Sequence, residues 1–452
     1  MKKSFAVVLA VLMLVSILIP LGAFTASARE SVVFTEGNFK YEVYDGEAWI
    51  VGATADLGSD IVIPSTLGGY PVVLICNIPG SPLVTSVTIP STVESIWPDV
   101  FEDCIHIERV YISDFAAWCE IDFDYNAVTW YCSNPLASGA ELYLNGEKMD
   151  LTNLVIPDGV EKIGDYAFIS EWDMIEGVIE TVEIPSSVTS IGQGAFCYCA
   201  GIKSIIIPDS VKFIGDNAFN SCSKLEQVTL SENIGYIEDY LFYDCTSLRS
   251  VNIPQGVKTI CEYAFARCHS LENVTIPDTV EKIEEGAFGG AISLKSITIP
   301  DSVTEIERFA FYGCKSLESV TLSPNVEFIN GMTFAECESL KSVEIPHGVL
   351  RLHDNVFENC KSLTSVTFPS SVRDIGEEVF LGCDNVVICC DKDDYAYEYA
   401  VQNGIKTHCD NVEQDVSVPA QTYDWKYLIV VCGAAVVALV VVAVVAKKKK
   451  AK

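Results

Sequence analysis

Cysteine is the residue in this sequence with the widest chemical potential: there are 18 cysteines and only five histidines. Eight of them recur at 23 residues or twice that spacing, and we call them the thiol ladder: Cys199, Cys222, Cys245, Cys268, Cys314, Cys337, Cys360 and Cys383. Many cysteines in an extracellular chain first suggest disulfides. In coils stacked in register, however, neighbouring side chains run parallel instead of converging as a disulfide requires. Because the one gap holds another small apolar residue, Ala291, we expect free, buried thiols that pack as small hydrophobic groups.

Two cysteine pairs outside the thiol ladder are better candidates for disulfides. They are Cys119 with Cys132, and Cys390 with Cys409. A metal site is not expected, because Cys197-x-Cys199 and Cys389-Cys390 lack a second pair at ligand spacing.

Catalytic motifs are also missing from the sequence. No histidine lies in an HExxH motif, and no GxSxG motif, glycine-rich phosphate loop or dinucleotide fingerprint occurs. Arg267-Cys268-His269 could place a nucleophile beside a base, but Cys268 belongs to the thiol ladder and should point inward. We expect no catalytic residue, no metal and no cofactor, and therefore no enzyme.

The charge of the chain restricts its partners. The formal net charge is −33, from 29 Lys+Arg against 62 Asp+Glu. The body between Arg29 and Trp425 is more acidic still, because eight of the basic residues lie at the two ends. Such a body is repelled by nucleic acid and by anionic lipid, which leaves proteins, glycans or cationic groups as partners.

The two ends of the chain are typical of targeting segments. Residues 1–28 have a basic start, an apolar stretch and the sequence Ala26-Ser27-Ala28, which predicts a signal peptide. Residues 427–446 are long and apolar enough for a transmembrane helix, and residues 447–452 form a basic tail that should stay cytoplasmic. We expect a secreted ectodomain anchored in the plasma membrane by this C-terminal helix.

A 23-residue period organises the chain between these ends. Phenylalanine recurs at nine positions: 196, 219, 242, 265, 288, 311, 334, 357 and 380. A period of this length indicates a solenoid in which each coil is one supersecondary unit. Each unit contains a short strand that ends at a proline, and then a turn or short helix around an Ala-Phe pair. The predicted fold is a mainly β solenoid with short turns or helices.

The period also divides the chain. We expect a β-hairpin cap at 29–60 that turns at Asp45-Gly46, first repeats at 61–113 and an insertion at 114–153. The main solenoid should span 154–387, and a C-terminal cap at 388–409 should contain a short helix, Tyr395 to Asn403. Residues 410–426 are a polar linker.

Two surface columns are candidate partner-binding sites. The first is the outward column of the repeat strands, which we call the threonine column: Thr229, Asn252, Thr275, Thr298, Thr321, Glu344 and Thr367. The second, the acidic patch, would suit a basic partner or Ca²⁺ and contains Asp216, Glu238, Asp239, Glu262, Glu284, Glu285 and Glu307. The columns have simpler explanations, because threonine suits any exposed strand and acidic residues increase solubility.

The repeat unit, written from Leu271 as LxxVxIPxxVxxIxxxAFxxC, resembles the BspA-type leucine-rich repeat family over roughly residues 60 to 408. The resemblance implies a curved leucine-rich repeat solenoid, display outside the cell and, in several members, adhesion to proteins of a host or a neighbouring cell. It implies no particular ligand. The leading hypothesis is therefore a cell-surface recognition protein. The alternatives are an inert scaffold of the cell envelope and an enzyme housed in the insertion at 114–153.

Overall fold

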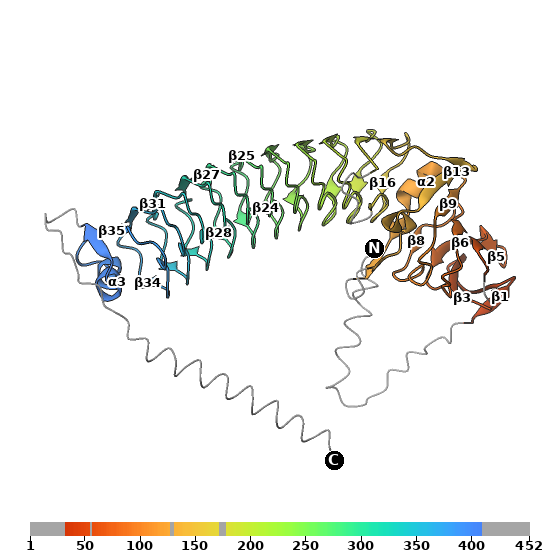
Figure 1. The fold of residues 1–452 in the computed structure, drawn as a ribbon, viewed down its shortest axis with the longest axis horizontal. Helices are drawn as coiled ribbons and strands as arrows, with labels where there is room; N and C mark the ends of the chain where they lie inside the picture. Colours follow the sequence, from red (N-terminus) through yellow and green to blue (C-terminus); the bar gives the residue numbers. More distant parts are fainter. Residues whose placement is uncertain (1–31, 55–56, 127–130, 171–177, 409–452) are drawn as a thin grey trace, which may run out of the picture.

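The protein is described by a computed structural model over residues 32–54, 57–126, 131–170 and 178–408. These residues form a curved row of stacked coils that ends at the helix α3 (Tyr395–Asn403) (Figure 1). The predicted mainly β solenoid is confirmed. The signal peptide, the linker, the transmembrane helix and the basic tail were all predicted in segments that lie outside the described residues. Among the residues described, no helix is long and apolar enough to cross a membrane.

One coil shows how the repeat folds. In β23 (Ser250–Asn252) the middle residue, Val251, is buried and both neighbours are exposed, as the alternation of a strand requires. Pro254 then starts a turn, in which its carbonyl accepts the amide of Val257 at 3.1 Å. The chain continues into β24 (Thr259–Ile260), where Ile260 is buried, and returns through turns around Phe265. Each coil is thus one turn of the solenoid and contains two short strands.

The first strands of successive coils line one edge of the row in Figure 1, where β25, β27 and β31 are labelled, and they pair in parallel within three sheets. They are β15 (Asn153–Val155), β17 (Thr181–Glu183), β19 (Ser204–Ile206), β21 (Gln227–Thr229), β23, β25 (Asn273–Thr275), β27 (Ser296–Thr298), β29 (Ser319–Thr321), β31 (Ser342–Glu344), β33 (Ser365–Thr367), β35 (Val387–Cys389) and β36 (Lys406–His408). We call them the first-strand face.

The second strands form a separate face. They are β16 (Lys162–Ile163), β18 (Ser190–Ile191), β20 (Phe213–Ile214), β22 (Tyr236–Ile237), β24, β26 (Lys282–Ile283), β28 (Glu305–Ile306), β30 (Phe328–Ile329), β32 (Arg351–Leu352) and β34 (Asp374–Ile375). In every one of them the second residue is an Ile or Leu that points into the core.

The N-terminal part extends both faces. One sheet contains β1 (Phe34–Glu36), β2 (Phe39–Tyr44), β3 (Glu47–Ala53), β5 (Thr66–Leu67), β6 (Tyr70–Ile75), β8 (Ser95–Ile96) and β10 (Asp122–Phe123). The other contains β4 (Asp60–Val62), β7 (Ser86–Thr88), β9 (Arg109–Ile112), β13 (Glu141–Leu144) and β14 (Glu147–Lys148). The hairpin expected at Asp45-Gly46 is present between β2 and β3, and both turn residues have positive φ.

The segment predicted as an insertion, 114–153, contributes strands to both of these sheets. After α2 (Phe115–Glu120), β10 pairs with β8, and β13 pairs with β9. Only a hairpin of β11 (Tyr125–Asn126) and β12 (Tyr131–Cys132) and the 3-10 helix η1 (Pro135–Ser138) lie between them. The segment thus completes coils of the solenoid, because its strands hydrogen-bond to the coil before it.

The phenylalanines of the repeat form one internal row. Ten buried rings, those of the nine predicted residues and of Phe168, lie with neighbouring centroids 5.4–5.8 Å apart and planes within 4–12° of parallel. The backbone fixes this spacing, since the amide of Phe265 donates to the carbonyl of Ala287 in the next coil at 2.8 Å. The core of the solenoid is therefore continuous from coil to coil.

The C-terminal end is closed by a helix. The predicted span of α3 agrees with the observed one, and Gly404 ends it in the left-handed conformation. Strand β36 then pairs with β35 as the last rung of the first-strand face.

Replacement of one phenylalanine of the internal row should destabilise the whole solenoid. Phe265→Ala leaves a cavity between two stacked rings and should cost about 3–5 kcal/mol of unfolding free energy. The measurement is urea unfolding followed by circular dichroism. Phe213→Ala is the control, because Phe213 is 42% exposed on β20 and should change stability much less. Equal losses in both variants would contradict the internal row.

Candidate functional site

The thiol ladder is buried and each of its eight thiols has a defined partner. Each S–H donates to the carbonyl of the phenylalanine in the preceding coil, as Cys245 does to Phe219 at 3.2 Å. The eight distances are 3.0–3.3 Å. Each ladder cysteine therefore does more than fill space. Its thiol gives the buried phenylalanine carbonyl an additional hydrogen bond, which a side chain without a donor could not supply. The sequence pattern indicated size and burial, but not this hydrogen bond.

Burial suppresses the reactivity of the ladder thiols other than Cys383, whose pKa is lowered by the hydrogen bond with its neighbour Cys360. Burial raises the pKa of the Cys314 thiol to about 12 and those of Cys222 and Cys268 well above their usual range. The thiolate is the nucleophilic form, so these groups are unreactive at neutral pH. Cys268 is fully buried, as expected, so the Arg267-Cys268-His269 sequence does not form an accessible nucleophile.

The disulfide predicted between Cys119 and Cys132 is not formed, and both residues are buried free thiols. Cys119 lies on α2, where its carbonyl accepts the amide of Gly164, and Cys132 pairs with Tyr125 in the β11–β12 hairpin. Of the second predicted pair, Cys390 is buried and Cys409 lies outside the described residues.

The threonine column lies where the sequence placed it. All seven residues occupy the third position of a first strand and are exposed. They follow one another in register, for example Asn252 beside Thr275 and Thr298 beside Thr321. The column is a continuous row of hydroxyl, amide and carboxylate groups on the first-strand face.

The same column continues toward the N-terminus with a different character. Ile206 pairs in register with Thr229 and is 68% exposed, and Val155 and Val62 at equivalent positions are 54% and 62% exposed. Tyr111 and Tyr143 hold the corresponding positions of β9 and β13, with ring centroids 5.1 Å apart. We call these five residues the apolar column; Thr88 and Glu183 hold the same outward position in β7 and β17 and interrupt it. Sequence reasoning missed it, although Ile206 lies 23 residues before Thr229.

The second-strand face also exposes aromatic rings that the sequence analysis did not identify. Phe213, Tyr236 and Phe328 occupy the first position of β20, β22 and β30, and each is exposed. In the sequence they could have been recognised as aromatic residues directly before the buried isoleucine of a second strand.

The acidic patch is partly neutralised by basic residues. Lys282 lies 3.4 Å from Glu284 and 3.3 Å from Glu307. Arg308 donates to Glu285 at 2.8 Å, as does the Tyr263 hydroxyl. Burial opposes ionisation of Glu285, but these two hydrogen bonds outweigh it and lower the pKa of that carboxyl.

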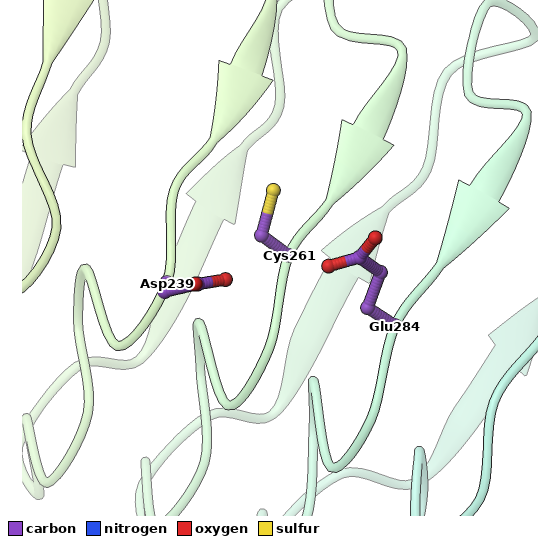
Figure 2. A group of neighbouring side chains, drawn as sticks. All are labelled: Asp239, Cys261 and Glu284. Atoms are coloured by element: carbon purple, nitrogen blue, oxygen red, sulfur yellow. The ribbon is translucent and has the colours of Figure 1, made fainter. Parts of the chain in front are cut away.

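Three neighbouring side chains, two of them in the acidic patch, bring together atoms of the kind that ligate metals. The ligand atoms of Asp239, Cys261 and Glu284 all lie within 4.8 Å of one another (Figure 2). Burial, followed by the charge of Asp239, raises the pKa of Glu262 next to it. The sequence analysis placed the two acids in the patch but did not identify Cys261 as their neighbour.

The segment 114–153 lines a cavity of about 240 Å³ between the β13–β14 hairpin and the next coil. Its walls are mostly apolar, with Leu136, Met149 and Phe168 among them. The charged groups that line it, Glu141 and Lys148, form an ion pair at 2.5 Å. Ser170 adds a hydroxyl to this lining, and the enzyme hypothesis for this segment stays a prediction.

Comparison with known proteins agrees with the repeat geometry. The family model of the BspA type leucine rich repeat region matches six copies, at residues 80–121, 145–272 and 258–387. The chain belongs to this family. The resemblance seen in the repeat unit is therefore confirmed. No curated protein matches the chain significantly.

Several solved structures are similar to this BspA-type chain. A leucine-rich repeat protein from Bacteroides ovatus is 25% identical, with 83% of this chain and 99% of that chain covered and a TM-score of 0.42. A leucine rich cell surface protein from Faecalibacterium prausnitzii is 26% identical, with 79% and 94% covered and a TM-score of 0.41. The pneumococcal vaccine antigen PcpA is 16% identical, with 86% and 99% covered and a TM-score of 0.43.

The buried thiols predict a loss of stability at high pH. The folded protein keeps protons on thiols that the unfolded chain releases above about pH 8.5, because their folded pKa is raised. The stabilisation is complete below that pH and falls as the pH rises toward 12, by about 1.4 kcal/mol per pH unit for each thiol. Urea unfolding between pH 7 and 10.5 measures this slope.

A double variant serves as the control for this prediction. Cys222→Ala with Cys245→Ala lowers stability at pH 7 but removes two titrating groups, so its stability should fall less steeply with pH. A slope identical to that of the unmodified protein would show that the ladder thiols do not cause the effect.

Proposed function

We propose that this protein recognises an extracellular protein or glycan through the first-strand face, and that it works at the cell surface. The observation that supports this most is the apolar column in line with the threonine column. Solubility explains exposed threonine and glutamate, but it does not explain Ile206, Val155 and Val62 exposed at the same outward position.

The composition of this face suits recognition. Interface centres are enriched in tyrosine and other large side chains, and polar groups surround them. Tyr111 and Tyr143 supply a pair of half-buried rings at one end, and the threonine column supplies hydrogen-bonding groups at the other. One partner in contact with both would bury apolar surface and gain hydrogen bonds.

Charge and targeting signals agree with this proposal. The net charge of −33 favours neutral or basic partners and disfavours nucleic acid. The segments 1–28 and 427–446 would export the solenoid and anchor it in the plasma membrane, with the repeats outside. The second sequence-based candidate set, the acidic patch, would serve a basic partner. Its ion pairs make it the weaker binding surface.

The test is binding of the purified protein to panels of extracellular matrix proteins, neighbouring-cell surface proteins and glycans. We expect a saturable ligand whose affinity falls about tenfold or more in Ile206→Lys and in Thr298→Lys, since each places a charge in the contact surface. Both side chains are exposed, so the fold should persist.

Thr304→Lys is the matched control. Thr304 is exposed in the same coil as Thr298 but lies after the turn, directly before β28, so this variant should keep the affinity. Absence of any saturable ligand would instead favour an inert scaffold of the cell envelope. An equal loss in all three variants would rule out the first-strand face as the binding surface.

A further inference from the structure

We propose that Asp239, Cys261 and Glu284 form a binding site for a thiophilic divalent cation such as Zn²⁺. The three residues come from successive coils and follow the second strands β22, β24 and β26. Their ligand atoms lie within 4.8 Å of one another, and Figure 2 shows Cys261 between the two carboxylates. Thiolate sulfur and carboxylate oxygen are both established ligands of zinc. This site lies off the first-strand face, so it is independent of the proposed recognition surface.

Cys261 differs from the thiol ladder in a way that points to a ligand. It is only 8% exposed, yet its thiol forms no hydrogen bond with any residue that the structure describes. Each ladder thiol, by contrast, donates to a carbonyl. A buried thiol without a partner, whose sulfur lies near two carboxylate oxygens, is arranged as a metal ligand would be.

The position of Cys261 in the repeat supports the same conclusion. The equivalent residues of neighbouring coils are polar or glycine and lie at the end of the second strand: Gly215, Glu238, Glu284, Glu307, Asn330 and His353. The repeat therefore does not require a small apolar residue here, as it does in the thiol ladder. Packing alone does not account for a cysteine at this point.

Electrostatics at the site favour a cation. Burial raises the pKa of Cys261, and the carboxylates of Glu238, Glu284, Asp239 and Asp216 raise it further. A divalent cation would reverse this effect, because it compensates the negative charge and releases the thiol proton on binding. The amide of Glu262 donates to Asp239 Oδ1 at 2.9 Å, which orients that carboxylate and leaves its other oxygen for a metal.

The site needs only a small adjustment to hold a metal. Bonds of about 2.0–2.3 Å to a tetrahedral zinc ion place neighbouring ligand atoms about 3.3–3.7 Å apart. Asp239 and Glu284 are half-buried, so rotation of their side chains can close the remaining distance. Three protein ligands leave the fourth position to water.

Lys282 is the natural competitor for this cation. Its ammonium lies 3.4 Å from Glu284, but it also contacts Glu305 at 3.5 Å and Glu307 at 3.3 Å. It can therefore release Glu284 and keep two partners. Removal of this charge should make metal binding tighter.

The test is titration of the reduced full-length protein with Co²⁺, whose thiolate complexes absorb in the near ultraviolet, followed by competition with Zn²⁺. We expect one equivalent of Co²⁺ to produce the thiolate band and Zn²⁺ to displace it. Cys261→Ala should abolish the band, and Asp239→Asn or Glu284→Gln should weaken binding about tenfold or more. Lys282→Gln should strengthen it.

Two controls separate this site from other thiols and acids. Cys245→Ala removes a ladder thiol, and Glu272→Gln removes an exposed carboxylate near β25, so both should keep the Co²⁺ band and the affinity. Circular dichroism checks that each variant folds. The proposal is overturned if no thiolate band forms, or if the band survives Cys261→Ala. A weakening of affinity in the controls equal to that in the ligand variants would also overturn it.

Discussion

Contact between successive coils is the constraint on which the rest of this structure depends. A coil of about 23 residues is too small to cover its own core, so each phenylalanine ring is covered by the ring before it and the ring after it. The backbone makes the same connection, because the amide of a phenylalanine in the internal row donates a hydrogen bond to a carbonyl of the next coil. A residue that faces the core is therefore selected for its fit to two neighbours at once, and this produces a strict period.

Polar groups inside the stack obey the same constraint. The ladder thiols donate to carbonyls of the preceding coil, and two buried serines do the same where the repeat lacks its proline. Ser231 donates to the carbonyl of Val211 and Ser323 to that of Val303, each at 2.6 Å. Each serine also accepts an amide two residues later, from Asn233 or Asn325. The two coils that lack the proline thus satisfy their buried turn in another way. The serine side chain forms hydrogen bonds with backbone groups of the turn that would otherwise lack a partner.

The sequence predicted the parts of the fold that repeat, because a period exposes them directly. The phenylalanine row, the outward position of Thr298 and the helix before Gly404 all follow from spacing or from local signals. The features that depend on three-dimensional proximity were missed. Each regular coil has two residues with positive φ, such as Tyr240 and Asp244, and few of these are glycines that would mark them. The segment 114–153 looked like an insertion because its coils break the period, although β10 and β13 pair like other rungs.

The candidate sites lie where the repeat imposes no requirement. Side chains outside the packed core contribute much less to the stack than the core residues do, so a residue there that differs from its column is not explained by packing. Ile206 places an exposed apolar side chain next to a polar column, and Cys261 places a buried thiol where other coils have glycine, glutamate, asparagine or histidine. In a protein whose interior is this uniform, specificity must come from such departures, because the regular coils are interchangeable. The period that identifies the fold therefore also identifies the residues that folding does not explain.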